Sequence, residues 1–188
     1  MYKFFLLSVL LLGLTMEGFS QSKVGDVSVP ESVDINGTSL VLNGAGIRSK
    51  FFMDMYVGAL FLKEKNNNAN SIISSDEPMS IRLYITSGMI TSQRMTDAIT
   101  EGFENATGGK TTPLMDKINQ FTAVFNEKIV VGDKFEFNAT KGSKVQVIKN
   151  GKQLTIIEGK DFKEALFGIW FCDTPADKNL KEKMLGKS

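Results

Sequence analysis

The hydrophobic pattern divides the chain into an apolar leader and a globular remainder. Residues 4–14 form an almost unbroken apolar run behind a short basic start, and small residues precede a candidate cleavage point between Ser20 and Gln21. This layout is typical of a secretory signal peptide, and the run is too short for a spanning helix, which needs about 20 residues. We therefore expect residues 1–20 to be removed on export. Residues 21–188 would then be one periplasmic or secreted domain.

Alternating apolar and polar positions predict strands at both ends of this domain. Residues 79–86 alternate Ile and Leu with Arg and Tyr, which is strand periodicity. Residues 46–61 form a longer extended candidate that is rich in aromatic residues and Val. Shorter strands are expected over residues 23–29, 39–42, 134–138, 144–148 and 153–157. The dipeptide Asn150-Gly151 between the last two is a strong hairpin signal.

In the middle of the chain the hydrophobic period changes from two to about 3.6. One helical stripe begins at Met95, a second follows Pro113, and a third covers residues 162–170. The segment that starts at Asp173 stops the third helix and can cap a last one, which ends at Gly186. Strands at both ends of a helical middle, without regular strand–helix alternation, predict an α+β fold. We expect an antiparallel sheet with helices packed on one face.

Composition excludes several kinds of chemistry. The chain has no His and one Cys, which removes His-based triads, His or Cys zinc sites and any intramolecular disulfide. With 22 Lys and Arg against 21 Asp and Glu, the net charge of +1 indicates no basic surface for nucleic acid. The glycine-rich segments at Gly44 and Gly109 lack the spacing of nucleotide-binding loops. We therefore expect no metal, no cofactor and no nucleic-acid partner.

Arg48 is the residue that most indicates a binding site. It is one of three Arg in the chain and lies in a largely apolar extended segment, where a buried cation without a partner is costly. Its planar guanidinium suits a carboxylate or another oxyanion. Tyr56 lies further along the same segment and could offer a hydroxyl to the same anion. Arg48 could instead pair with an internal carboxylate or reach water, and Tyr56 could be a core aromatic.

The residues around Arg48 also carry a family resemblance. The block Asn-Gly-Ala-Gly-Ile-Arg at residues 43–48 is its most specific part, and residues 33–62 and 165–186 support it. On these residues the chain resembles the chalcone isomerase-like family over essentially all of residues 21–188. The resemblance implies an open-faced β-sandwich, in which a large antiparallel sheet carries a layer of helices on one face. It also implies a ligand cleft between the sheet and the helices.

The two branches of that family imply different uses of the cleft. In the plant enzyme branch, an Arg that Arg48 matches stabilises charge while a flavanone ring closes. In the fatty-acid-binding branch an Arg and a Tyr hold a lipid carboxylate, and Arg48 and Tyr56 match them. The other polar residues of the enzyme branch align with Met55, Met95, Gly102 and Gly168. The polar network that catalysis needs is therefore expected to be absent.

We therefore expect a non-catalytic binder of a fatty acid or a similar apolar carboxylate. The expected ligand-binding residues are Arg48, Tyr56, Met55, Met95 and Gly168. Each buried CH₂ contributes about 0.8 kcal/mol and a charge-assisted hydrogen bond about 1.5–3 kcal/mol, so the tail supplies most of the affinity. Two alternatives stay open. One is an intramolecular lyase that uses Arg48, and the other is a structural or partner-binding envelope protein with Arg48 paired internally and the cleft filled by side chains.

Overall fold

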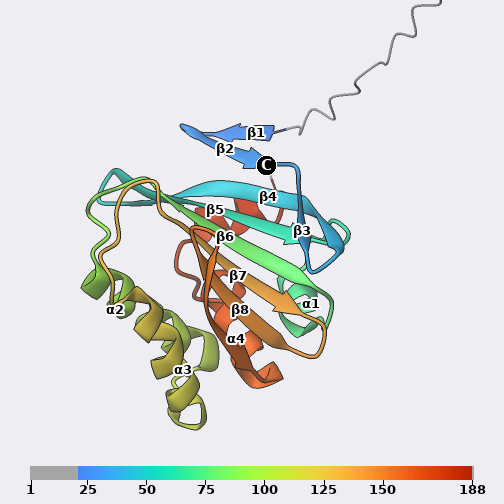
Figure 1. The fold of residues 1–188 in the computed structure, drawn as a ribbon, viewed down its shortest axis with the longest axis vertical. Helices are drawn as coiled ribbons and strands as arrows, with labels where there is room; N and C mark the ends of the chain where they lie inside the picture. Colours follow the sequence, from blue (N-terminus) through green and yellow to red (C-terminus); the bar gives the residue numbers. More distant parts are fainter. Residues whose placement is uncertain (1–20, 188) are drawn as a thin grey trace, which may run out of the picture.

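The fold is built on one antiparallel sheet whose strands follow each other in sequence order (Figure 1). A computed structural model describes residues 21–187; the predicted signal peptide, residues 1–20, lies outside the described residues, as does residue 188. The sheet consists of β3 (Ser32–Ile35), β4 (Thr38–Lys50), β5 (Met53–Leu62), β6 (Met79–Ile85), β7 (Lys134–Thr140), β8 (Lys144–Lys149) and β9 (Lys152–Glu158). The pattern-based prediction of an antiparallel sheet is confirmed.

Helices cover one face of this sheet. They are α1 (Ala69–Ser74), α2 (Ser92–Thr107), α3 (Met115–Thr122), α4 (Lys160–Phe171) and α5 (Lys178–Met184), with 3-10 turns η1 (Thr112–Leu114) and η2 (Ala123–Phe125) flanking α3. Their apolar faces form one large core with the sheet, which includes Phe103, Phe121 and Trp170. No helix within residues 21–187 is long and apolar enough to cross a membrane. The predicted α+β architecture, with its helical layer on one face, is confirmed.

The opposite face of the sheet carries a smaller core beneath a separate hairpin. This hairpin pairs β1 (Gln21–Val24) with β2 (Val27–Pro30) and lies above the sheet in Figure 1. Val29 of β2 is fully buried against Leu40 and Phe61 of the sheet. From Met55 to Leu62, β5 is therefore buried on both faces of the sheet, by helices on one side and by the two-stranded ribbon on the other.

The turn between β4 and β5 differs from the sequence prediction. Residues 46–61 were expected to be one extended segment, but they form two antiparallel strands joined at Phe51 and Phe52. Lys50 pairs with Met53 across this two-residue loop. Neither Gly, Asn nor Pro marks the turn, so the residue types that usually signal a hairpin are missing from it.

Three shorter features also depart from the pattern. Residues 23–29 form a hairpin instead of a single strand, because the chain turns at Gly25, where φ is +57°. The helix α1 was not predicted; it begins after Asn68, whose side chain accepts a hydrogen bond from a backbone N–H of the first turn. The last helix, α5, is capped by Asp177 and not by Asp173.

Candidate functional site

The helix-facing side of β4 explains the glycines of the Asn-Gly-Ala-Gly-Ile-Arg block. A Cβ on Gly44 would lie 2.1 Å from the carbonyl oxygen of Lys183, and a Cβ on Gly46 would lie 2.6 Å from Lys183 Cβ. Both positions therefore need Gly for α5 to pack directly on the strand. Side chains alternate along a strand, so Arg48 lies on the same face, two residues beyond the part that α5 covers.

A β-bulge brings Met55 and Tyr56 to Arg48. Arg48 pairs with Tyr56 across the hairpin, whereas the next pair is Ser49 with Asp54, so Met55 is an extra residue in β5. A bulge of this kind re-aims neighbouring side chains. Both Met55 and Tyr56 are buried in the core on the helix side of the sheet. Three of the predicted site residues thus meet on one face of one hairpin.

These three residues and Met95 line a cavity of about 280 Å³ between the β4–β5 hairpin and α2. Met55, Met95 and Ile90 are buried and form an apolar wall. The rim is exposed and charged, and it contains Lys50, Arg94, Asp97 and Glu101. The cavity therefore has an apolar interior and a charged entrance.

Arg48 has no carboxylate partner within residues 21–187. Of the three Arg, Arg82 forms an ion pair with Glu136 at 2.8 Å, and Arg94 Nη1 donates to the carbonyl oxygen of Met89 at 3.1 Å. Arg48 is half-buried, forms no ion pair with any described residue, and lies over the ring of Tyr56, with 5.6 Å between Cζ and the ring centroid. Its guanidinium is therefore free to bind an anion in the cavity.

The hydroxyl of Tyr56 is fixed by a hydrogen bond from the helical layer. Trp170 Nε1 donates a hydrogen bond to Tyr56 Oη at 3.0 Å, and both side chains are buried. Burial raises the pKa of the Tyr56 phenol above its usual value of 10.0, although the positive charge of Arg48 acts in the opposite direction. The phenol is therefore neutral at ordinary pH. Because its oxygen accepts from Trp170, its own proton remains to be donated to a ligand.

Gly168, which was also predicted to bind ligand, does not line this cavity. It lies where α4 crosses α2, and a Cβ there would be 2.8 Å from Ala106 Cβ. Gly102 belongs to the same crossing, because its Cβ would be 2.7 Å from Ile169 Cγ2. Both glycines therefore allow two helices to approach closely. The geometry brings together four of the five predicted residues, namely Arg48, Met55, Tyr56 and Met95.

Sequence reasoning did not single out the charged rim. Arg94, Asp97 and Glu101 follow each other at helical spacing beside Met95 on α2. That spacing, i to i+3 and i+7, indicates one shared helix face and could have revealed the rim. Lys50 comes from the other side, at the end of β4. The signal was present in the sequence, but only the packing of α2 against the hairpin gives it a role.

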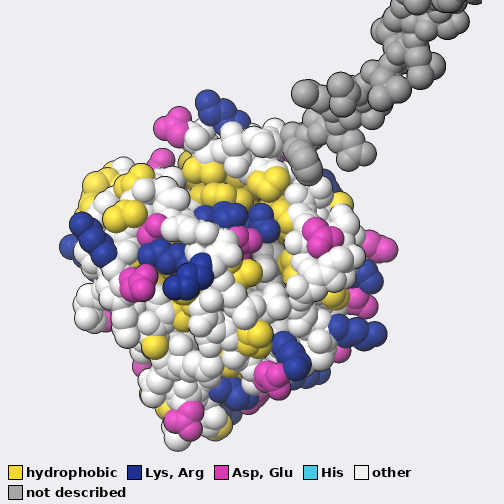
Figure 2. All heavy atoms as spheres, viewed as in Figure 1, with side chains coloured by type: hydrophobic (Ala, Val, Ile, Leu, Met, Phe, Trp, Pro, Cys, Tyr) yellow, Lys and Arg dark blue, Asp and Glu magenta, His cyan; other side chains and the backbone are white. Residues whose placement is uncertain are grey.

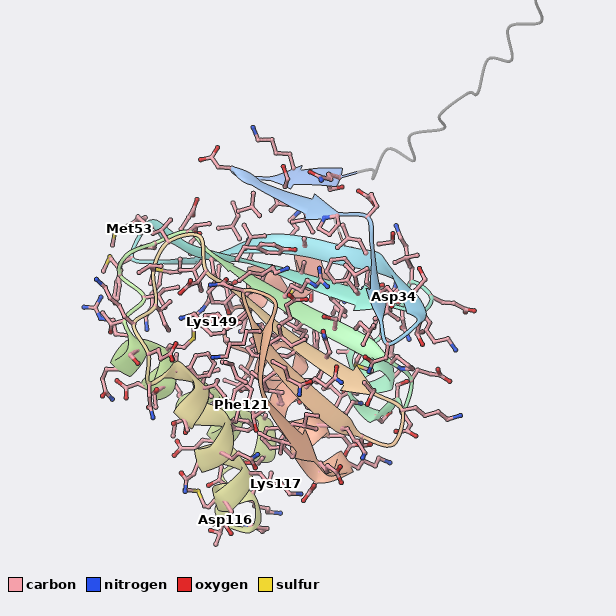
Figure 3. The ribbon with its side chains drawn as sticks, in the orientation of Figure 1. Asp34, Met53, Asp116, Lys117, Phe121 and Lys149 are labelled. Carbon is pink, nitrogen blue, oxygen red and sulfur yellow. The ribbon has the colours of Figure 1, made fainter. Side chains whose placement is uncertain are left out.

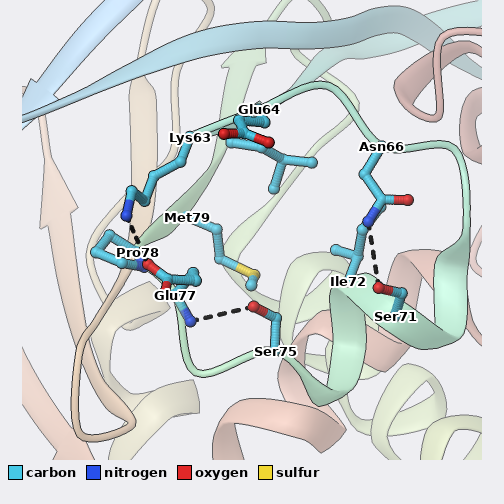
Figure 4. A pocket seen from close by; sticks show the side chains of 10 residues that line it. Lys63, Glu64, Asn66, Ser71, Ile72, Ser75, Glu77, Pro78 and Met79 are labelled. Atoms are coloured by element: carbon cyan, nitrogen blue, oxygen red, sulfur yellow. Dashed lines mark hydrogen bonds and ion pairs between the residues drawn. The ribbon is translucent and has the colours of Figure 1, made fainter.

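A second hollow lies at the opposite end of β5 and differs in character (Figure 4). Its volume is about 270 Å³, and most of its polar groups pair with one another. Lys63 Nζ lies 3.0 Å from Glu77 Oε2, and Asn66 Nδ2 donates to Ser71 Oγ at 3.2 Å. Lys63, the cation of this hollow, is therefore already paired with a carboxylate, whereas Arg48 is not.

The antiparallel sheet carries a single main helical layer, which defines an open-faced β-sandwich. The apolar cavity with a charged entrance between sheet and helices is its candidate ligand site. The family model described as chalcone isomerase-like matches residues 21–186, and the chain belongs to this family. Among solved structures, it is similar to a fatty-acid binding protein from Arabidopsis thaliana (AtFAP1), with a TM-score of 0.67 and 17% identity. The match covers 85% of this chain and 92% of that chain, and at this identity it shows the fold. No curated protein sequence matches the chain.

Proposed function

We propose that the protein is an exported, non-catalytic binder of a fatty acid or a similar apolar carboxylate. The observation that carries the proposal is Arg48, a cation without a carboxylate partner among residues 21–187, at the wall of an apolar cavity. The cavity volume of about 280 Å³ is near the lower end of ligand sites, which hold about 300–1,000 Å³. The similar Arabidopsis protein is named as a fatty-acid binding protein, and this name supports the same class of ligand.

The ligand head would meet Arg48 and Tyr56. Arg48 would donate to the carboxylate through its planar guanidinium, and the neutral Tyr56 hydroxyl would donate a second hydrogen bond. The tail would pack on Met55, Met95 and Ile90, where flexible methionines adapt to different chain shapes. Because the cavity is small, we expect affinity to rise with acyl-chain length and then to level off once the tail fills it.

The cavity lining argues against the lyase alternative. Met55 and Met95 present apolar side chains to the cavity, and Gly102 and Gly168 serve the contact between α2 and α4. Arg48 therefore has no further hydroxyl or amide at the four aligned positions with which to position a substrate. The structural alternative required an internal ion pair for Arg48 and a filled cleft. Neither is present within residues 21–187.

Replacing Arg48 tests the proposal. Arg48→Ala should weaken dodecanoate binding about 10–100-fold, the value of a charge-assisted hydrogen bond, and leave dodecanol binding nearly unchanged. Isothermal titration measures both affinities, and native mass spectrometry with organic extraction identifies any co-purifying acyl species. Lys63→Ala is the matched control, because it removes a cation from the second hollow and should change neither affinity.

Two results would contradict the proposal. If dodecanoate does not bind the parent protein, or binds Arg48→Ala equally well, the carboxylate site is not at Arg48. If the parent protein accelerates the loss of absorbance of a simple chalcone and Arg48→Ala does not, the protein is an isomerase.

A further inference from the structure

The tip of the β4–β5 hairpin is an unusual turn. Phe51 and Phe52 form the two-residue loop between Lys50 and Met53, and their φ angles are +54° and +61°. Loops with positive φ at both positions favour Asn-Gly, because other residues are strained there. A Phe-Phe pair therefore makes the backbone of this turn less stable than Asn-Gly would. Such strain typically persists where a side chain has a use.

The two Phe side chains at this turn are also exposed to solvent. Phe51 is 74% exposed, Phe52 is fully exposed, and Met53 is 40% exposed. Figure 2 shows hydrophobic side chains gathered at this corner beside Lys and Arg side chains, and Figure 3 labels Met53 there. Lys50 Nζ lies 5.6 Å from the centroid of the Phe51 ring. The tip therefore presents a protruding aromatic pair with an adjacent cation.

We propose that this tip inserts into the interface of a phospholipid bilayer. The two rings and Met53 offer on the order of 400 Å² of apolar surface, about half of the roughly 800 Å² per partner that a stable protein interface buries. A small convex aromatic tip fits the boundary between headgroups and acyl chains, where apolar side chains are buried and cations meet phosphates. The charges around the tip are of both signs, because Asp97 lines the cavity together with Lys50 and Arg94, and Asp54 follows Met53 in the chain. Insertion therefore depends mainly on the rings, and zwitterionic lipid suffices.

Docking in this way would place the cavity entrance at the lipid surface. Phe51 and Lys50 belong to both the tip and the rim of the cavity. An apolar carboxylate that partitions into the bilayer could then pass between lipid and cavity without crossing water. This consequence rests on the proposed function; the insertion itself does not.

Fluorescence of a tryptophan at the tip tests the insertion directly. In the full-length Phe52→Trp variant, phosphatidylcholine vesicles should shift the indole emission to shorter wavelength, and lipids brominated in the upper acyl chain should quench it. Trp170, 2% exposed, supplies a constant background that the parent protein measures. An emission spectrum unchanged by vesicles would overturn the proposal.

Vesicle flotation measures how much the rings contribute. The double variant Phe51→Asn with Phe52→Gly should lower vesicle partitioning about 100-fold, about 10-fold for each ring. Its melting temperature should not fall, because Asn-Gly suits the turn. Met115→Ser is the control; Met115 is 43% exposed and adjoins Asp116, at the opposite end of the molecule in Figure 3. All variants share residues 1–20, so differences in vesicle partitioning among them result from the substituted side chains.

Other outcomes separate this inference from the proposed function. Equal flotation of the double variant and the parent would overturn insertion, and so would a concentration-dependent dimer that the double variant loses. Phe52→Gly should keep its dodecanoate affinity in vesicle-free buffer, because Phe52 is not among the residues that line the cavity. Vesicle binding without dodecanoate binding would contradict the proposed function but would agree with insertion.

Discussion

Three side chains connect the sheet, the cavity and the helical core. Arg48 lies over the ring of Tyr56, and Tyr56 Oη accepts a hydrogen bond from Trp170 Nε1. Trp170 in turn packs beside Phe137, with 5.9 Å between ring centroids. Because buried packing immobilises Trp170, the Tyr56 hydroxyl has one defined position at the cavity. A site of this kind is organised before the ligand arrives.

Tyr56→Phe should lower both stability and affinity. The Trp170 N–H would be left buried and unpaired, which costs about 1–3 kcal/mol in the free energy of unfolding. Loss of the hydroxyl should weaken dodecanoate binding about 3–10-fold. Urea unfolding and titration measure the two effects. With its pKa raised by burial, Tyr56 stays protonated, and parent affinity should be constant between pH 7 and about 10.

Tyr84→Phe is the matched control for that prediction. The Tyr84 hydroxyl is buried without a hydrogen-bond partner among the described residues, so its removal should be neutral or stabilising. If both variants lose the same stability, the bond from Trp170 has no particular value.

At the scale of elements, the helix α5 covers the part of β4 that precedes Arg48. It packs directly on β4 because Gly44 and Gly46 offer no side chain, and Gly58 on β5 allows Leu180 to approach. The loop before α5 leads to its cap, where the Asp177 side chain accepts a hydrogen bond from the Leu180 N–H. The glycines of the family block therefore place a helix, and Arg48 lies at the edge of the area this helix covers.

Gly46→Ala should weaken this packing. The added Cβ would lie 2.6 Å from Lys183 Cβ, so α5 must shift away from β4. Overpacking of this kind typically costs about 1–3 kcal/mol, and we expect about 2 kcal/mol by urea unfolding. Gly88→Ala is the control; it has open space around its Cβ position and should be neutral or slightly stabilising. Equal stability of both variants would mean that α5 adjusts without cost.

Across the whole molecule, the sheet separates two cores with different tasks. The large core on the helix side contains the cavity wall, whereas the small core holds the β1–β2 hairpin on the other face. The two share only the backbone of the sheet. Changes beneath the hairpin should therefore alter stability without altering the site.

Val29→Ala tests this separation. Val29 is fully buried beneath the hairpin, and its truncation should lower the free energy of unfolding by about 1–2 kcal/mol. Dodecanoate affinity of the folded variant should remain within about twofold of the parent, measured by titration well below the melting temperature. A larger loss of affinity would show that the two faces are coupled.

Local periodicity was sufficient to predict most of the fold. The period-two segments at 79–86, 144–148 and 153–157 became strands, and the stripes that begin at Met95 and Phe162 became helices. Arg48 and Tyr56 could be chosen from sequence because a cation and a phenol in an apolar strand are unusual. These features depend on residues that are close together in the sequence, within one or two helical turns or strand positions. The chain itself therefore contains that information.

Only the tertiary structure decided how those pieces meet. The bulge at Met55 changes which side chains face Arg48, the Phe51-Phe52 turn carries no usual signal, and Gly168 packs a helix instead of lining the cavity. Each depends on register or on close approach between segments distant in sequence. By itself the sequence determined which faces are apolar and that Arg48 lies in a largely apolar segment. Strand register and helix packing decided that this cation borders a cavity, because they alone determine which distant surfaces touch.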